Sequence, residues 1–204
     1  MKNELLNIIT ITDSSPLKQN TYLVMFKDTS ILIDCGAPFQ SILSAYNNKF
    51  PSTSFPKIDA VFLTHTHFDH ILYLKEIDDL FHPIVYAKVG AKSFIQNPRH
   101  NMSILIGENL TYLPKNLIEI STENDISVKD IILTPIFTPG HTECSVCYKI
   151  ADSMFTGDTI FNSGLGRTDL PTGNYSALLQ SIKHLQHFLA NIYYPGHGTP
   201  FKML

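Results

Sequence analysis

The sequence predicts an α/β protein in which mixed β-sheets are flanked by helices. Three observations support this prediction. Short runs of β-branched and apolar residues alternate with helical periods in both halves of the chain. Hydrophobic residues make up 44% of the 204 positions, which is enough for a sizeable core. No linker, low-complexity tract or charge block divides the sequence, so residues 1–204 are expected to form one domain.

The first half of the chain contains four expected strands and two expected helices. β-branched and apolar runs predict strands over residues 21–26, 31–33, 58–63 and 84–86. The polar residues 27–29 between the first two runs predict a hairpin. Apolar side chains three and four positions apart predict helices built on Phe39, Ile42, Leu43 and Tyr46 and on Ile71, Leu74, Ile77 and Phe81. Because the second helix separates the last two strands, those strands are expected to be parallel.

The second half repeats this style, without sequence similarity that would show an internal repeat. Strands are expected over residues 131–137, 145–150, 153–156 and 191–194. A last helix is predicted from Leu178, Leu179, Ile182, Leu185 and Phe188. Three loops that contain glycine follow the strands of this half, at residues 138–141, 157–158 and 195–198.

Charge and cysteine content restrict the binding partners and the cellular compartment that can be expected. Fifteen basic and eighteen acidic residues give a net charge of −3 and are scattered, so no nucleic-acid partner is expected. No apolar run approaches the ~20 residues of a membrane span, and residues 1–4 lead into a polar stretch rather than a signal-peptide core. Three cysteines cannot all pair with one another, which favours a reducing compartment. We therefore expect a cytoplasmic protein that does not bind membranes.

Histidines and aspartates form the most informative motif. In an extended segment, His65 and His67 point to the same side and can bind one metal ion together. Asp69 and His70 follow at the start of a helix and are available to a second ion. The alternative is that Asp69 caps the helix and that the histidines are solvated loop residues.

Three further loops each add one potential ligand after an expected strand, namely His141, Asp158 and His197. Ligands in layered α/β proteins collect at the carboxyl ends of strands, so these loops are placed to converge with the first motif. Five imidazoles and two carboxylates suit zinc, manganese or iron. Because one closed structural zinc ion needs only four ligands, seven candidates predict two ions with positions open to water.

The chain resembles the metallo-β-lactamase fold metallohydrolases, and among them the short hydroxyacylglutathione hydrolase-like, or glyoxalase II-like, proteins. The motifs that carry the resemblance are Asn20-Thr21-Tyr22-Leu23-Val24, Ile33-Asp34-Cys35-Gly36, Thr64-His65-Thr66-His67-Phe68-Asp69-His70, Asn97-Pro98, Asn101-Met102-Ser103, Thr138-Pro139-Gly140-His141-Thr142, Thr156-Gly157-Asp158-Thr159, Gly166-Arg167-Thr168-Asp169 and Tyr194-Pro195-Gly196-His197-Gly198. The resemblance implies an αβ/βα four-layer sandwich with the metals at the edge of two packed sheets. One departure is Leu72-Tyr73, where the family usually has two glycines.

The resemblance also implies a role for each candidate ligand. It places His65, His67 and His141 on the first metal, Asp69, His70 and His197 on the second, and Asp158 between them. Asp34 would orient a ligand. Longer glyoxalase II enzymes add a C-terminal helical domain that helps to bind glutathione. This chain ends seven residues after His197, so that substrate-binding surface is expected to be missing.

These observations predict a dinuclear metal hydrolase, most simply a thioesterase for small thiol esters such as S-lactoylglutathione. Zinc is the first expectation for both ions, with iron or manganese as alternatives. Asp69 would accept the proton of the attacking water. Arg167 either contacts a carboxylate of the substrate or forms an ion pair with Asp169. The alternatives are a persulfide dioxygenase with one iron, a lactonase and a metal-binding module without turnover.

Overall fold

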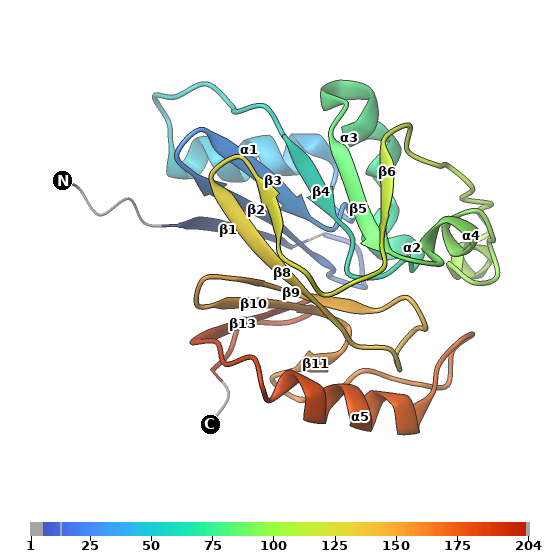
Figure 1. Cartoon of the computed structure of the whole chain (residues 1–204). Coiled ribbons are helices and arrows are strands. Elements are labelled where there is room, and N and C mark those ends of the chain that lie inside the picture. Colours follow the sequence, from blue (N-terminus) through green and yellow to red (C-terminus); the bar gives the residue numbers. More distant parts are fainter. Residues whose placement is uncertain (1–5, 13, 203–204) are drawn as a thin grey trace.

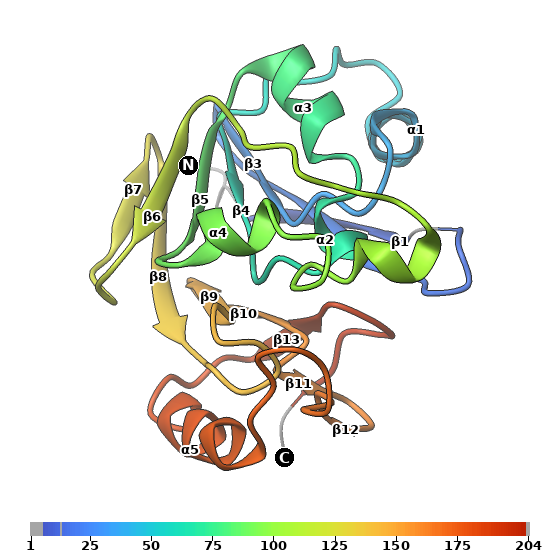
Figure 2. The same ribbon diagram turned by 90° about the vertical axis from the view of Figure 1, so that its right-hand side faces the viewer.

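The computed structural model describes residues 6–12 and 14–202, and it consists of two β-sheets packed face to face with helices on both outer sides (Figures 1 and 2). The first sheet has the order β1-β2-β3-β4-β5-β6, and the second has the order β13-β10-β9-β8-β7. The predicted α/β class and the four-layer arrangement implied by the resemblance are confirmed. Residues 1–4, from which no signal peptide was expected, lie outside the described residues.

The strands of the first sheet are β1 (Asn7–Thr12), β2 (Asn20–Phe26), β3 (Thr29–Ile33), β4 (Ala60–Phe62), β5 (Ile84–Lys88) and β6 (Leu117–Ile120). Strands β1 to β3 are antiparallel, and β3 to β6 are parallel. The predicted hairpin and the predicted parallel pair, β4 and β5, are therefore present. Parallel strands end at one edge, and this edge carries Asp34 after β3 and the histidine motif after β4.

The strands of the second sheet are β7 (Ile126–Val128), β8 (Ile131–Phe137), β9 (Val146–Ile150), β10 (Ser153–Gly157) and β13 (Ile192–Pro195). A short hairpin is formed by β11 (Ile160–Phe161) and β12 (Gly164–Leu165). Helices α1 (Phe39–Lys49), α2 (Phe68–Ile71), α3 (Leu74–Phe81) and α4 (Ala91–Ile95) and the 3-10 turn η1 (Ser103–Ile106) lie on the side of the first sheet. Helix α5 (Tyr175–Leu185) covers the second sheet. Among the described residues, no helix has the length and apolarity needed to cross a bilayer.

The main core lies between the two sheets. Tyr22 and Phe62 from the first sheet pack there with Tyr148 and Phe155 from the second, and all four are buried. Burying one large apolar side chain contributes roughly 1.5–3 kcal/mol, so this layer holds the sheets together. Separate apolar clusters lie beneath the helices of the first sheet and beneath α5. Cys144 belongs to the former and Cys147 to the latter, so the two side chains face opposite ways.

Several elements differ from the sequence prediction. The segment described as a polar stretch contains β1, in which buried Ile9 and Ile11 alternate with exposed threonines. The single helix expected over residues 71–81 is two helices, because the backbone at Tyr73 is not helical. Helix α5 begins at Tyr175, earlier than expected, because the Asn174 side chain caps it by accepting a hydrogen bond from the Ala177 amide at 2.9 Å.

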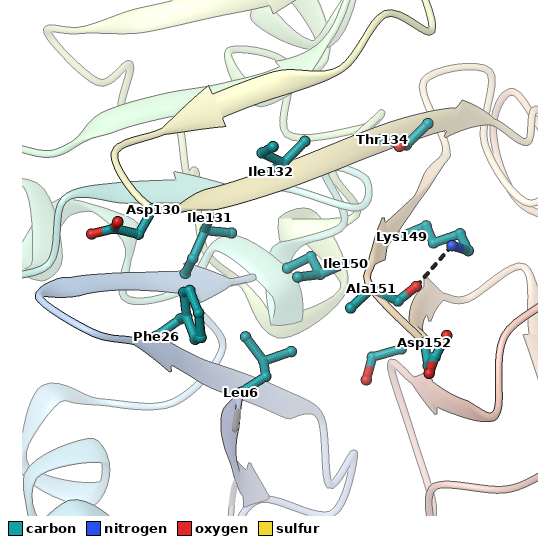
Figure 3. A pocket seen from close by; sticks show the side chains of 11 residues that line it. Leu6, Phe26, Asp130, Ile131, Ile132, Thr134, Lys149, Ile150, Ala151 and Asp152 are labelled. Atoms are coloured by element: carbon teal, nitrogen blue, oxygen red, sulfur yellow. Dashed lines mark hydrogen bonds between the residues drawn. The ribbon is translucent and has the colours of Figure 1, made fainter. Parts of the chain in front are cut away.

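The sheets also separate at one end of the sandwich, leaving a cavity of about 590 Å³ (Figure 3). Phe26, Ile131 and Ile150 form its apolar wall, together with Leu6. Phe26 is the last residue of β2, whereas Asn20, at the opposite end of that strand, is hydrogen-bonded to the loop that carries His197. The cavity is therefore at the end of the sandwich remote from the predicted metal ligands.

Candidate metal centre

The structure brings all seven predicted metal ligands together at one edge of the sandwich. They form three overlapping groups, in each of which the ligand atoms lie within 4.8 Å of one another. The groups are His65, His67 and His141; His65, His70 and Asp158; and Asp69, His70 and His197. The prediction that the four loops converge is confirmed for the residues that the structure describes.

Strand ends position these side chains. His65 and His67 lie in the extended segment that follows β4, and the backbone turns at His67 into α2, which carries Asp69 and His70. The other three ligands each follow a strand of the second sheet, namely β8 for His141, β10 for Asp158 and β13 for His197. The site therefore lies where both sheets end, and it takes ligands from each.

The first group consists of three buried imidazoles that face one another. His67 Nδ1 lies 3.2 Å from His65 Nε2 and 2.9 Å from His141 Nε2. Each neutral imidazole has one donor and one acceptor nitrogen, so three nitrogens that point at one place cannot all be satisfied by each other. Three such nitrogens suit a divalent cation, which accepts all three lone pairs.

The other two groups share His70 and surround the two carboxylates, and together they are called the second group below. His197 Nε2 lies 3.3 Å from Asp69 Oδ2 and 3.5 Å from Asp158 Oδ2, and His70 Nε2 lies 3.4 Å from Asp158 Oδ1. Asp158 Oδ2 is also 3.6 Å from His141 Nε2 in the first group. Asp158 thus contacts ligands of both groups, which is the position that the resemblance assigns to it.

Hydrogen bonds at Nδ1 orient four of the five imidazoles. The acceptors are the Asp34 carboxylate for His70 at 2.7 Å, the Arg167 carbonyl for His141 at 2.8 Å and the Leu17 carbonyl for His197 at 2.8 Å. Thr64 Oγ1 lies 3.2 Å from His65 Nδ1. Occupation of Nδ1 leaves Nε2 free to bind a metal, which is how partners around a metal site fix the tautomer of its ligands.

Asp34 organises the edge of the first sheet beneath the ligands. Its backbone has φ +60°, in the left-handed region that Asp tolerates better than most residues. Its carboxylate accepts hydrogen bonds from the Thr64 amide and the Thr64 hydroxyl, each at 2.8 Å, and from His70. Asp34 is buried, so it orients the ligand without touching bulk water.

Unpartnered polar atoms test whether these residues fit a metal. His67 Nε2, His70 Nε2 and Asp158 Oδ1 are buried and have no hydrogen-bond partner. Two of these atoms, His70 Nε2 and Asp158 Oδ1, face each other at 3.4 Å within the cluster. Leaving a buried polar atom unsatisfied costs ~1–3 kcal/mol, and a cation at this place would relieve that cost. The donor set of imidazoles and carboxylates therefore fits a divalent metal.

Burial and neighbouring charges divide four of the histidine ligands into a pair with lowered pKa values and a pair with raised pKa values. Burial lowers the pKa of His65 and His67, and neighbouring imidazoles lower it further, in His67 to about 3. Burial also opposes the charge on His70 and His197, but carboxylates outweigh it. They raise the pKa of His70 well above its usual value and that of His197 to about 10. The first pair is neutral and ready to coordinate, whereas the second pair holds protons when no metal is bound.

The two carboxylates are ionised for the converse reason. Burial raises the pKa of Asp158, but the charge of His70 and the contact with His197 reverse this effect and hold it well below the usual range. The pKa of Asp69 is lowered by the same two histidines against the effect of burial. Ionised oxygens are the form that metals bind.

The simpler explanation of the histidine motif is wrong. Helix α2 begins at Phe68 with His67 at its N-cap, and no side chain caps it, so Asp69 is not a helix cap. His65, His67 and His70 are buried, so they are not solvated loop residues.

Arg167 and Asp169 form a two-point ion pair, with Nε and Nη2 of Arg167 at 2.8 and 2.7 Å from the two carboxylate oxygens. Both side chains are exposed. His184 on α5 contacts the Glu123 carboxylate at 3.0 Å. This carboxylate also accepts a hydrogen bond from the Phe137 amide at 2.5 Å and so links α5 to β8. No sequence spacing indicates this contact.

Two residues that support the ligands, Gln19 and Thr64, were not predicted to do so from the sequence. Gln19 is buried, its Nε2 lies 3.3 Å from His70 Nδ1, and its backbone pairs with that of His197. Thr64 directly precedes His65, and this adjacency was the one available signal. The position of Gln19 depends on packing between distant segments, so no local pattern could have identified it.

Comparisons with known proteins agree with this geometry. The model of the metallo-beta-lactamase superfamily matches residues 15–197. A protein of Streptococcus pyogenes named "Probable metallo-hydrolase" is 36% identical over 191 residues, which cover 88% of this chain and 79% of that protein. The crystal structure of the BLEG-1 B3 metallo-β-lactamase has a TM-score of 0.82 at 26% identity and covers 97% of this chain and 94% of its own. A second crystal structure, of TTHA1623 in a di-iron-bound form, has a TM-score of 0.75 at 25% identity, with 95% and 93% covered.

The matched region contains all seven residues of the three ligand groups, from His65 to His197. Together with the shared fold, this shows that the chain belongs to the metallo-β-lactamase superfamily.

Proposed function

We propose that this metal-dependent hydrolase uses two divalent ions to hydrolyse small thioesters, with S-lactoylglutathione as the reference substrate. The observation that carries the proposal is the contact of Asp158 with histidines of both ligand groups. One carboxylate in this position can join two ions. The similar TTHA1623 chain, whose crystal structure is of a di-iron-bound form, supports a dinuclear site.

We assign His65, His67 and His141 to the first ion, and Asp69, His70 and His197 to the second, with Asp158 shared. Nitrogen and carboxylate oxygen ligands without thiolate fit zinc, iron and manganese. We propose zinc first because it favours mixed histidine and carboxylate sets in hydrolases.

Divalent ions held there would lower the pKa of a bound water and polarise an acyl carbonyl. Asp69 is suited to accept the proton of that water, because its carboxylate is ionised and lines the small cavity over the ligands. A thiolate leaves with little need for a proton because the pKa of a thiol is about 8.5. The ligand residues therefore suffice without a serine, cysteine or lysine nucleophile.

Two other reactions use overlapping ligands. A persulfide dioxygenase would need one iron and would consume oxygen, and a lactonase would share the ligands and differ in the walls of the cavity. A metal-binding module without turnover would show no activity with any substrate.

Metal analysis followed by a substrate panel tests the proposal. The full chain, purified without added metal and then loaded separately with zinc, iron or manganese, should bind about two ions and hydrolyse thioesters. Uptake of one ion in excess metal would contradict the dinuclear site. Oxygen consumption with a persulfide, or preferential opening of lactones, would replace the thioesterase assignment.

A further inference from the structure

Apolar side chains surround the candidate metal centre. The ligands open into a small cavity of about 200 Å³. Apart from ligand residues and Arg167, its lining consists of Leu17, Phe68, Met102, Leu105 and Leu170. These five side chains come from the loop before β2, the start of α2, the turn η1 and the loop before α5. Separate segments thus bring apolar groups to one place, as in ligand-binding clefts.

Two of these apolar side chains are substantially exposed to solvent. Leu105 is 69% exposed and Leu17 is 46% exposed. A single exposed leucine needs no explanation, but exposed apolar groups that border one cavity mark a binding surface. Neither residue can contribute much to the core, so their position at the cavity is not explained by folding.

The turn that presents Leu105 is firmly built. The Asn101 carbonyl accepts a hydrogen bond from the Phe68 amide at 2.7 Å, and the Asn101 side chain donates to the carbonyls of Ile95 and Leu110. Ser103 is buried and accepts a hydrogen bond from the Leu110 amide. These hydrogen bonds hold the turn η1 against the metal-binding motif. The Leu105 side chain remains free to contact a bound substrate.

Away from the metal ligands, the cavity offers little to a polar substituent. Among the described lining residues other than those ligands, Arg167 has the one polar side chain, and Asp169 engages its guanidinium at two points. The hydroxyl of a lactoyl group, placed against Leu105 or Met102, would lose its hydrogen bonds to water. A plain alkyl chain would instead bury apolar surface on both sides.

We propose that Leu17, Phe68, Met102, Leu105 and Leu170 form an acyl-binding wall that selects thioesters of unsubstituted aliphatic acids over those of hydroxy acids. This inference rests on the proposed thioesterase function and narrows its substrate class. The wall serves the acyl side because common cellular thiols carry carboxylates or phosphates, and its five apolar side chains have no group that could pair with them. An unbranched hexanoyl chain is a simple probe of such an apolar wall.

Matched thioesters test the selection. With the same metal-loaded protein, the S-hexanoyl and S-lactoyl esters of glutathione differ only in the acyl group. We expect kcat/KM to be at least about tenfold higher for the hexanoyl ester, since each methylene in an apolar pocket adds severalfold. Equal values, or a preference for the lactoyl ester, would overturn the proposal. Hydrolysis of neither ester would contradict the thioesterase function instead.

Variants within one turn separate the wall from general effects. Leu105→Ser should lower kcat/KM for the hexanoyl ester by about 5–20-fold, mainly through KM, and leave the lactoyl ester nearly unchanged. Ile106→Ser is the matched control, because Ile106 is 46% exposed in the same turn and does not line the cavity. Equal effects of the two variants on the hexanoyl ester would overturn the role of Leu105.

A binding measurement is independent of turnover. Titration calorimetry with the thioethers S-hexylglutathione and S-methylglutathione should show tighter binding of the hexyl compound and a negative heat-capacity change. Leu105→Ser should remove most of the difference. Equal affinity for the two thioethers would overturn the proposal even if both thioesters are hydrolysed.

Discussion

At the scale of single residues, most of the histidine ligands are oriented by hydrogen bonds that their Nδ1 atoms make on the side away from the cluster. Asp34, the Arg167 carbonyl and the Leu17 carbonyl each accept a hydrogen bond from the Nδ1 atom of one histidine. Each contact leaves the Nε2 lone pair directed at the cluster. Losing such a partner costs about 10–100-fold in metal affinity or activity in comparable sites.

Asp69→Asn should separate metal binding from turnover. The amide still offers an oxygen, but it cannot accept a proton. We expect turnover to fall by about a hundredfold or more, while the total metal content falls much less. Metal analysis and kinetics on the same preparation check this, with His65→Ala as the variant that loses metal. Near wild-type turnover with metal bound would show that Asp69 has no role as a base.

Arg167→Ala tests the substrate role predicted for this residue. Because the ion pair with Asp169 is exposed and screened by water, its loss should change stability little. If Arg167 contacts a substrate carboxylate, KM for S-lactoylglutathione should rise by about tenfold and that for a thioester of an uncharged thiol much less. Equal changes with both substrates, or a clear drop in melting temperature, would assign Arg167 to the loop alone.

The affinity for metal should rise with pH. In the metal-free protein His197 has a pKa of about 10 and is protonated near neutral pH, but a metal needs its lone pair. Metal binding must then release this proton and the proton of His70, so the affinity of the second site should increase by at least about tenfold per pH unit between pH 6 and 9. Competition with a chromophoric chelator at several pH values measures this. An affinity that is constant over this range would contradict the protonated state of His197.

At the scale of elements, the sequence was informative where periodicity was strong and uninformative where pairing is non-local. The strands that carry the ligands, β4, β8, β10 and β13, were predicted to within about two residues because they are apolar runs with polar loops behind them. Strands β1, β6 and β7 were missed. All three are partly exposed, and β6 and β7 are also short, so their stability comes from neighbouring strands rather than from their own composition.

The ligand motifs could be predicted for a related reason. Each ligand lies in the segment that follows a strand, and Asp69 and His70 lie in the short helix that begins there, so the chain itself fixes their position at the sheet edge. The break between α2 and α3 at Tyr73 could not be predicted from apolar spacing, because Ile71, Leu74 and Ile77 continue the same period across it. The tie between Glu123 and His184 likewise depends on the arrangement of distant elements.

The loop after β13 should tolerate no side chain at Gly196. A Cβ there would overlap the Asp158 carboxylate and approach the His70 ring. Gly196→Ala should therefore displace these ligands and weaken the second metal site by about tenfold or more, because small-to-large changes in packed sites cost about 1–3 kcal/mol. Thr199→Ala, in an exposed part of the same loop, is the control. Retention of two ions with normal affinity in Gly196→Ala would show that the loop can move aside.

At the scale of the whole molecule, the ligand cluster is a second connection between the sheets. The inter-sheet core holds the sheets together by apolar contact. At the edge, His65, His67, Asp69 and His70 follow a strand of the first sheet, whereas His141, Asp158 and His197 follow strands of the second. Ions bound by both sets would join the two sheets. They would bind only the folded chain, because the unfolded chain does not hold these ligands together.

Metal removal should consequently destabilise the whole sandwich. A ligand present at about a hundred times its Kd and bound only to the folded state adds about 2.7 kcal/mol per site. In a chain of this length that corresponds to a rise in melting temperature of about 5–10 °C for one site. Thermal unfolding of the full chain, with and without a chelator, measures the shift. Asp158→Ala should lose most of it, because Asp158 contacts both ligand groups, whereas Ile106→Ser should keep it. If chelation leaves the melting temperature of the wild-type chain unchanged, the cluster does not bind ions that join the two sheets.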